Sequence, residues 1–435
     1  MSKIIYLTAG AGGMFCGSCM HDNALTRALR EFGWDIQLFP TYTPIRTDEE
    51  DVSVDQVLFG GVNVYLQQKI PLLRYVPAFL DRFLDSPWLI RKVTSRAMET
   101  DAKMLGKLAL SMLMGAHGNQ RKEVKQICKW LSSVRPDLLI FSNILIGGCI
   151  ESIKRDTGIP ILVTLQGDDV FLDSLNEPYR TKCIARITEL SKQVDGFIVQ
   201  SEFFRDYMSD YFSIPRDQFH VTPLGLELHD FESFRERQPA DNGAEAGQTI
   251  GYLARLAPEK GLHHLVDAFI WLKQQPETDS IRLKIAGWLG PQHQSYADQQ
   301  FTKLNEAGLE DAFEYLGAVD RSGKLEFLNS IDLLSVPTEF LEPKGLYVLE
   351  AWAAGVPVVQ PAHGAFPELI NASGGGELVA PGDREQLGRA LLELLRDPQR
   401  RLQLGQKGQN FVWQQRNAQS MAESTSAVIR QFVDQ

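Results

Sequence analysis

The chain has 435 residues, of which 44% are hydrophobic and 23% charged, and these proportions exclude an intrinsically disordered protein. At roughly 150 residues per domain, the length predicts two or three domains. The 44 Lys and Arg against 55 Asp and Glu give a net charge of −11, which argues against a dedicated nucleic-acid-binding protein.

Membrane and secretion signals are weak in this sequence. It has no run of about 18 apolar residues, so we expect no membrane-spanning helix. The N-terminus lacks the apolar run and the cleavage site of a secretory signal. The five cysteines are an odd number and do not suggest a disulfide framework, so a reducing cytoplasm is the expected compartment.

In the first half, apolar and β-branched runs alternate with helix-period segments. The predicted strands are residues 4–8, 36–39, 62–66, 138–141, 161–165, 197–200 and 220–222. A Gly-rich loop and a helix from about residue 22 to 32 follow the first strand. This alternation indicates parallel βαβ units, which we assign to a first domain, 1–231. A long aromatic segment, about 71–129, is predicted to be a helical insertion in that domain.

A polar segment with Pro and Gly, 232–248, is predicted to be a linker. The alternation then resumes, with predicted strands at 250–253, 283–286, 313–316, 333–336, 356–359 and 377–379. We assign 249–410 to a second domain and 411–435 to a final helix. The fold class is therefore α/β with two doubly wound units. Open parallel sheets bind ligands at the carboxyl ends of their strands, and two such units facing each other would form a cleft.

The most informative segment, 337–359, predicts a loop, a helix, a Gly turn and a strand. Glu342 lies in the loop and Glu350 follows eight residues later on the helix. Gly345 lies near the helix start, where unpaired backbone N–H groups can hold an anion. A carboxylate accepts two hydrogen bonds and suits a vicinal diol such as that of ribose. For either Glu alone, an exposed acid is the commoner interpretation.

In combination, the two Glu residues, the Gly between them and the following Ala-Gly-Val-Pro-Val-Val resemble glycosyltransferase family 4, the glycosyl transferases group 1, which includes glycogen synthase. The resemblance implies a GT-B fold, with two Rossmann-like domains facing across a cleft and a last helix crossing back to the first domain. It also implies retaining transfer from a nucleoside-diphosphate sugar. The segments 251–261, 363–368 and 378–383 look like the family as well.

The resemblance implies a role for each matching residue. Arg255 and Lys260 would stabilise the leaving diphosphate, because fixed cations offset the charge that develops there. Glu342 would lie beside the donor hexose and Glu350 would hold the ribose. The remaining donor-side candidates are the backbone of Gly345 and Leu346, and the glycines Gly12, Gly13 and Gly17 of a loop resembling the family's phosphate-approaching loop.

Cys16-Gly-Ser-Cys19, in the same Gly-rich loop, offers a competing interpretation. A Cys-x-x-Cys pair at a helix start is typical of thioredoxin-like redox motifs, although the length and the C-terminal motifs do not fit that small fold. A zinc site needs about four ligands, and no second Cys pair with metal-binding spacing is present.

The segment 163–169 matches the family only in part. Gln166 stands where the family often has His, and it can hydrogen-bond a donor hydroxyl but cannot act as a general base. Asp169 matches the family's acid and would orient an acceptor hydroxyl; a polar strand end is the alternative. Because Asp168 and Asp169 are adjacent, without an Asp-x-Asp motif, we expect no metal.

Other features bear on the donor and the acceptor. Lys344 stands in place of the family's common Phe, and Pro223-Leu-Gly225 in place of Pro-Asn-Gly. His21 is a weak candidate near the Gly-rich loop, whereas His263 and His264 are expected to pack or meet solvent. The segment 69–107 has eight basic and four acidic residues with interleaved aromatics. It could meet an anionic or lipid-linked acceptor at a membrane, but an ordinary amphipathic helix pair is favoured.

The sequence thus predicts a retaining, metal-independent glycosyltransferase that uses no cofactor. Its partners would be a nucleotide-sugar donor and a saccharide or lipid-linked acceptor, not nucleic acid. We expect it in the cytoplasm, with peripheral contact at the inner membrane face through 69–107 as the alternative. Rival hypotheses are another GT-B enzyme, such as a nucleotide-sugar epimerase or a phosphorylase, and a non-catalytic nucleotide-sugar-binding protein.

Overall fold

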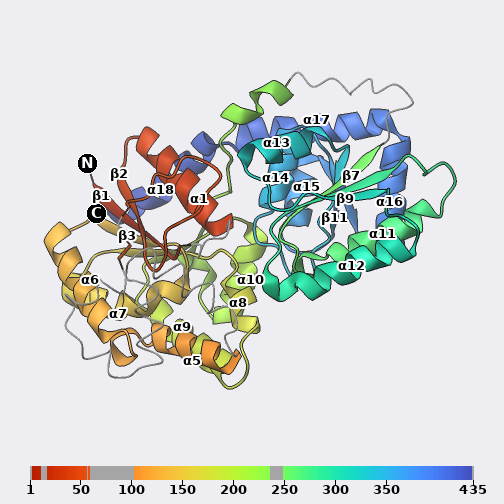
Figure 1. Ribbon diagram of the computed structural model, residues 1–435. Helices are drawn as coiled ribbons and strands as arrows, with labels where there is room; N and C mark the ends of the chain where they lie inside the picture. The colour runs from red at the N-terminus through yellow and green to blue at the C-terminus, as the bar shows by residue number, and fades with distance from the viewer. Residues whose placement is uncertain (1, 11–16, 56, 59–101, 236–247, 434–435) are drawn as a thin grey trace. The chain divides into compact units, whose positions relative to one another are not determined.

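A computed structural model describes residues 2–10, 17–55, 57–58, 102–235 and 248–433 (Figure 1). The chain divides into two compact units. Unit 1 comprises Met1–Pro223 and Met421–Gln435, and unit 2 comprises Leu224–Ser420. The sequence placed this boundary after residue 231. The structure places it earlier because Leu226 forms a parallel bridge with Asn417, which fixes the connecting segment to unit 2.

Unit 1 contains a six-stranded parallel sheet in the order β2-β1-β3-β4-β5-β6. Its strands are β1 (Lys3–Thr8), β2 (Asp35–Pro40), β3 (Leu138–Phe141), β4 (Ile161–Thr164), β5 (Gly196–Val199) and β6 (Phe219–Val221). Its helices are α1 (Gly17–Glu31), α5 (Ala102–Leu113), η2 (Gly115–His117), α6 (Arg121–Val134), η3 (Ile144–Cys149), α7 (Ile150–Thr157), α8 (Asp168–Asp173), α9 (Tyr179–Ser191), α10 (Glu202–Phe212) and η4 (Arg216–Gln218). The central strands are buried along their whole length, as their continuous apolar runs predicted.

Unit 2 contains a second six-stranded parallel sheet, in the order β12-β11-β10-β7-β8-β9. Its strands are β7 (Thr249–Leu253), β8 (Arg282–Ala286), β9 (Phe313–Tyr315), β10 (Leu333–Leu334), β11 (Val358–Pro361) and β12 (Gly376–Val379). Its helices are η5 (His229–Phe234), η6 (Pro258–Lys260), α11 (Leu262–Lys273), η7 (Pro291–His293), α12 (Gln294–Glu306), α13 (Arg321–Asn329), α14 (Leu346–Ala353), α15 (Phe366–Ser373), α16 (Arg384–Arg396) and α17 (Pro398–Gln415). Helices α11, α12 and α16 lie along one side of the sheet and α13, α14 and α17 along the other (Figure 1). Both units are thus doubly wound, Rossmann-like α/β units, which confirms the predicted fold class.

The predicted final helix, 411–435, is the end of one helix followed by a second helix. Helix α17 ends at Gln415, and α18 (Ala418–Val433) follows after Arg416 and Asn417. The break occurs where Leu226 donates its backbone N–H to the Arg416 carbonyl at 2.8 Å. Helix α18 packs within unit 1, where the Trp34 indole donates to Ser426 Oγ at 2.8 Å.

Some predicted features fall outside the described residues. The predicted strand at 62–66 and most of the basic segment 69–107 lie there, whereas α5 and α6 form the described part of the predicted insertion. Across the ranges that the structure describes, every helix is too short or too polar to cross a bilayer.

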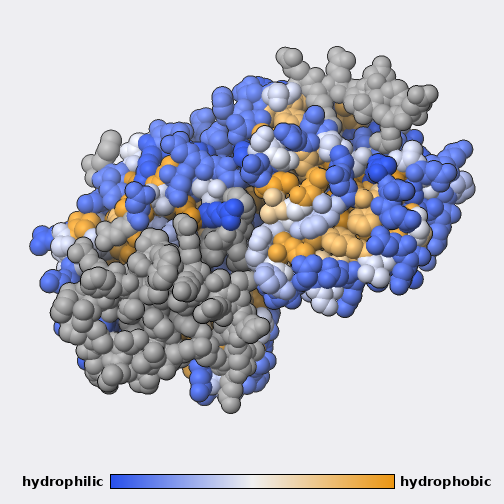
Figure 2. All heavy atoms as spheres, in the orientation of Figure 1, coloured by the Kyte–Doolittle hydropathy of each residue, from blue (hydrophilic) through white to orange (hydrophobic). Residues whose placement is uncertain are grey.

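On the face of unit 2 in Figure 2, hydrophobic residues gather toward the middle and hydrophilic residues surround them.

Candidate functional site

The candidate site in unit 2 is built on two loops at one edge of its sheet. One loop, 254–261, follows β7, and the other, 335–345, follows the adjacent strand β10. Because neighbouring parallel strands end at the same edge, the two loops meet there. Gly261 has a φ of +72°, and a Cβ at this position would lie 1.8 Å from the Pro337 carbonyl oxygen. Only glycine permits this close approach of the two loops.

Lys260 and Glu342 meet where these loops approach. Lys260 Nζ donates to Glu342 Oε2 at 3.0 Å, and the hydroxyl of Tyr347 donates to the same oxygen at 3.2 Å. The backbone N–H of Gly345 donates to Glu342 Oε1 at 3.2 Å. Glu342 is only 5% exposed, so this carboxylate is a buried acceptor with both of its oxygens in use.

Electrostatics keep Glu342 ionised despite its burial. Burial alone would raise the pKa of this carboxyl, but the charge and hydrogen bond of Lys260, the Gly345 N–H and the charge of Lys344 outweigh it and lower the pKa. Lys344, which replaces the family's common Phe, therefore adds positive charge to the loop. The arrangement supplies a fixed carboxylate next to fixed cations.

Arg255 lies in the same loop as Lys260 and takes a different partner. Its guanidinium pairs with Glu259 at 3.1 Å, and its side chain is 39% exposed. The buried Tyr252 lies beneath the loop, and its hydroxyl donates to the carbonyls of Arg255 and Lys260, at 3.2 and 3.3 Å. The Tyr252 hydroxyl thus fixes the loop backbone, while the Arg255 side chain is partly exposed to solvent.

The start of α14 lies beside Glu342. Gly345 is the residue before the helix, with a φ of +64°, and Leu346 is the first helical residue. The first N–H groups of a helix have no partner within it and carry partial positive charge. This end of α14, together with Lys260, is suited to an anion such as a diphosphate.

Glu350 lies on α14 and has a cation partner that the sequence analysis did not identify. Lys324 on α13 donates from Nζ to Glu350 Oε1 at 2.6 Å, and both side chains are 8% exposed. The two residues are 26 positions apart, and nothing in the local pattern around Lys324 indicates this contact. The pair fixes Glu350 on the same helix that begins beside Glu342.

In unit 1, Gln166 belongs to a buried network around Asp22. The Gln166 side-chain amide donates to Asp22 Oδ1 at 2.9 Å and to the Ser142 carbonyl at 3.1 Å. Tyr6 and Thr8 also donate to the Asp22 carboxylate, each at 2.7 Å. The amide nitrogen of Gln166 is therefore engaged inside unit 1, and its contact with a donor stays a prediction.

Asp168 and Asp169 begin α8 and differ in their surroundings. Asp168 accepts the backbone N–H groups of Ile144 and Gln166, each at 3.0 Å, and so joins two loops. Asp169 is 4% exposed, and its Oδ1 is buried without a hydrogen-bond partner. Burial raises the pKa of Asp168 to about 7 and that of Asp169 to about 6. Asp169 is thus the acid with an acceptor atom available.

The Gly-rich loop is described only at its end. Gly17 is the first residue of α1, while Gly12, Gly13 and Cys16 lie outside the described residues. Cys19 is buried on α1. The predicted roles of this loop therefore stay predictions.

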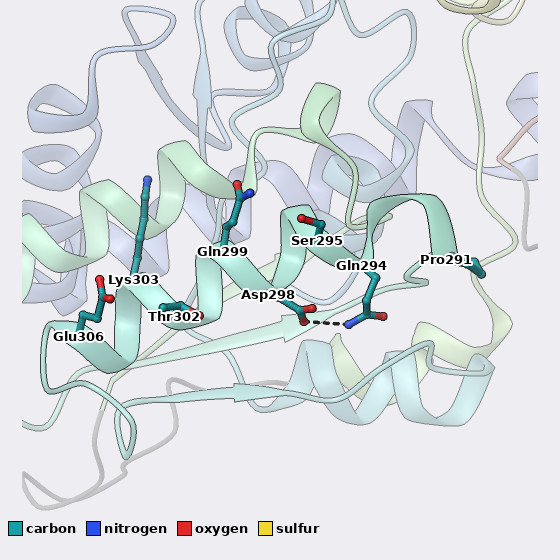
Figure 3. Close-up of a pocket in the computed structure, with 8 residues that line it drawn as sticks. All are labelled: Pro291, Gln294, Ser295, Asp298, Gln299, Thr302, Lys303 and Glu306. Atoms are coloured by element: carbon teal, nitrogen blue, oxygen red, sulfur yellow. Dashed lines mark hydrogen bonds between the residues drawn. The ribbon is translucent and has the colours of Figure 1, made fainter. Parts of the chain in front are cut away.

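A surface hollow along α12 contains none of the predicted site residues. Figure 3 shows its lining side chains, which come from α12 and the turn before it, with Gln294 donating to Asp298 at 2.8 Å. Lys303 in this hollow pairs with Asp267. The hollow lacks a buried carboxylate–cation pair, so the loops after β7 and β10 remain the better candidate.

Two family models match this chain. Residues 234–411 match "Glycosyl transferases group 1" and residues 113–230 match "Glycosyltransferase Family 4". The first range contains Arg255, Lys260, Glu342 and Glu350, and the second contains Asp169.

The curated relatives of this chain include proteins named as glycosyltransferases and synthases of sugar polymers. An MMP alpha-(1->4)-mannosyltransferase of Mycolicibacterium hassiacum is 27% identical over 53% of this chain and 54% of that protein. A glycogen synthase of Mycobacterium tuberculosis is 26% identical over 71% of this chain and 72% of that protein. The first three curated relatives are matched over 38 to 54% of their own length, so the chain spans about half the length of these relatives.

Solved structures share the fold. A sucrose-phosphate synthase from Thermosynechococcus elongatus superposes with a TM-score of 0.69 at 19% identity, over 99% of both chains. HepE from Anabaena, in complex with UDP-glucose, gives a TM-score of 0.67 at 15% identity, over 99% of this chain and 100% of that one. With both units of the chain matched by family models and the whole of it by this fold, the protein belongs to glycosyltransferase family 4, with the GT-B fold of two Rossmann-like domains.

Proposed function

We propose that this protein is a retaining glycosyltransferase that moves one sugar from a nucleoside-diphosphate sugar to an acceptor hydroxyl. Unit 2 would bind the donor. The observation that carries the proposal is the pair of the partly buried Lys260 with the buried Glu342, 3.0 Å apart, beside the first N–H groups of α14. A fixed cation and a helix start can stabilise a leaving diphosphate, while a fixed carboxylate can accept hydrogen bonds from a sugar.

The diphosphate would be held by Lys260, Arg255 and the start of α14. The exposed Arg255 guanidinium can turn from Glu259 to a more highly charged phosphate, since it pairs with Glu259 at the surface. Glu350, fixed by Lys324, would accept hydrogen bonds from the ribose hydroxyls. In this proposal the charge of the leaving group is offset by side chains and the helix start, and no divalent metal takes part.

Retention of configuration would follow if the acceptor hydroxyl attacks the anomeric carbon from the same face of the donor sugar that the leaving diphosphate departs from. Both oxygens of Glu342 are engaged by Lys260, Tyr347 and the Gly345 N–H, which argues against this carboxylate as a nucleophile. The acceptor hydroxyl would then bond to the anomeric carbon as the bond from that carbon to the phosphate oxygen breaks. Its proton would pass to that phosphate oxygen.

Unit 1 would bind the acceptor, with Asp169 accepting a hydrogen bond from the hydroxyl. The unpartnered Oδ1 of this buried acid supports the assignment, because such an atom gains most from a ligand donor. On α10, the Phe203 and Tyr207 rings stack with centroids 5.9 Å apart and lie partly exposed. Tyr207 interacts with Asp169, so the rings lie next to the atom proposed to accept the hydroxyl. The apolar face of a sugar could pack on these rings. We therefore propose a saccharide acceptor.

A thermal-shift screen against UDP, GDP, ADP and dTDP, with and without their common sugars, tests donor binding. At a hundredfold excess over the dissociation constant, the matching diphosphate should stabilise the fold by about 2.7 kcal/mol. A shift with one diphosphate identifies the donor class. No shift with any of them contradicts the donor site.

Site variants then test the residues. Lys260→Ala or Glu342→Ala should abolish transfer and the diphosphate shift while the fold persists. Lys303→Ala, which removes an exposed lysine that pairs across from α12 to Asp267 on α11, is the matched control and should retain both. Consumption of donor without acceptor would favour an epimerase, dependence on free phosphate a phosphorylase, and binding without turnover a non-catalytic protein.

A further inference from the structure

Two histidines at the start of α11 and one glutamate in the loop after β10 converge on one point. The Nε2 atoms of His263 and His264 lie 3.1 and 3.2 Å from the same atom, Glu339 Oε1. The ligand atoms of the three residues all lie within 4.8 Å of one another. We propose that His263, His264 and Glu339 bind a divalent first-row transition metal ion, with Zn²⁺ as the reference ion.

The donor set fits such an ion. Imidazole nitrogens and a carboxylate suit zinc and its neighbours, and two His and one Glu leave a position for water. The side chains of His263, His264 and Glu339 are 23%, 21% and 53% exposed, so an ion and its water can reach them. The two imidazole rings lie side by side, with centroids 4.1 Å apart, although the residues are adjacent in sequence.

Negative charge next to the histidines also favours a cation. The carboxylates of Glu339 and Asp267 both act electrostatically on His264.

Tyr296 on α12 supplies the outer support that metal-bound histidines usually have. Its hydroxyl oxygen lies 2.8 Å from His263 Nδ1 and accepts the backbone N–H of His263 at 3.2 Å. With a metal on Nε2, the imidazole proton would sit on Nδ1 and donate to the Tyr296 oxygen. This contact would fix both the tautomer and the ring orientation.

The loop that carries Glu339 is already held in place. The backbone N–H of Glu339 donates to the Glu259 carbonyl at 3.0 Å, and the His363 imidazole lies 2.8 Å from the Thr338 carbonyl oxygen. A bound metal would join this loop to α11. Glu339 precedes Glu342 by three positions and His263 follows Lys260 by three, so the ion would lie close to both loops of the proposed donor site without touching the reacting atoms. Metal binding itself does not depend on the proposed function.

Titration of the chelator-treated, metal-free full chain with Zn²⁺, and with Co²⁺ as a coloured probe, tests the site. We expect one metal ion to bind per chain, with a dissociation constant that is micromolar or lower. Binding of Co²⁺ should give a visible absorption band, and binding of Zn²⁺ should raise the melting temperature. His264→Gln and Glu339→Gln should each weaken binding about 100-fold or more, and Tyr296→Phe about 10-fold. His229→Gln, at an exposed histidine elsewhere in unit 2, is the matched control and should bind like the parent.

All three ligand side chains are at least partly exposed, so we expect the variants to fold. Melting curves recorded without metal check this. Failure of the parent chain to bind Zn²⁺ would overturn the proposal. So would equal binding by His264→Gln, Glu339→Gln and the parent, since the metal would then sit elsewhere, for example on cysteines. The diphosphate thermal shift, measured separately, reports on the proposed function and not on this site.

Discussion

Lys324 and Glu350 form a buried ion pair between α13 and α14, with Nζ and Oε1 2.6 Å apart and both side chains 8% exposed. Burial removes both charges from water, so Glu350 depends on Lys324 for compensation. Helix α14 also begins beside Glu342, so this pair fixes the orientation of a helix that contributes to both ends of the proposed donor site.

Removing only the cation should therefore be costly. Lys324→Met leaves Glu350 buried and unpaired, and we expect a loss of about 3–5 kcal/mol in the free energy of unfolding. The double variant Lys324→Met with Glu350→Leu should recover much of this stability, because neither charge then remains. Urea unfolding of the two variants checks this. Equal losses in both would show that packing, and not charge pairing, dominates.

The hydroxyl of Tyr347 should stabilise the ionised form of Glu342. Tyr347→Phe removes a hydrogen bond to a charged group and should lower the free energy of unfolding at pH 7 by about 1.5–3 kcal/mol. Because the folded-state pKa of Glu342 lies below its unfolded value of about 4.5, its contribution is present above that pH and is lost as the pH falls through the folded-state pKa.

The loss caused by Tyr347→Phe should therefore shrink as the pH falls well below 4.5. Unfolding experiments across pH 7 to pH 3 measure this dependence. A loss of the same size at every pH would assign the effect to packing of the ring and would contradict the electrostatic explanation.

Strand positions could be predicted from the sequence because buried parallel strands are continuous apolar runs. Leu138–Phe141 is a clear case, and the predicted and observed bounds agree. The start of α1 could not be predicted in this way. The sequence pattern predicts a start at about Asp22, but the helix begins at Gly17, and Asp22 lies inside it as the acceptor for Tyr6 and Thr8.

The site was predictable only in part, for a related reason. Lys260 and Glu342 belong to local motifs and could be selected from the sequence. Lys324 could not, because its contact with Glu350 spans 26 positions. Gln166 could be selected, but its contact with Asp22 spans 144 positions, and local patterns do not encode such a partner. The convergence of His263, His264 and Glu339 likewise depends on how two loops meet. Contacts of this kind require the fold.

Helix α18 should stabilise unit 1 although it follows the whole of unit 2 in sequence. Ile429 is fully buried in this helix, and Ile429→Ala should cost about 2–5 kcal/mol. Hydrogen exchange measured by mass spectrometry should show faster exchange in β1 to β6 and unchanged exchange in β7 to β12. Ile285→Ala in β8, also fully buried, is the control and should give the reverse pattern. Faster exchange in unit 2 with Ile429→Ala would contradict the assignment of α18 to unit 1.

The ionised Asp169 side chain should lower the free energy of unfolding at neutral pH, although it would serve to orient the acceptor hydroxyl. Its pKa in the folded protein is raised from 3.8 to about 6, so folding favours the protonated acid. Between these two pKa values the folded state binds more protons than the unfolded state, and stability falls as the pH rises. Asp169→Asn removes this penalty and should raise the free energy of unfolding at pH 8 by roughly 2–3 kcal/mol at most.

The same substitution should have little effect on stability below pH 3.8, where the acid is protonated in both states. It should also reduce transfer to acceptor at every pH, while the diphosphate thermal shift in unit 2 stays unchanged. Such a variant would be more stable, would still bind donor and would transfer poorly, which is the combination expected where an unpartnered acid is kept for a ligand. Full transfer activity in Asp169→Asn would instead make this residue a structural acid and move the acceptor site elsewhere.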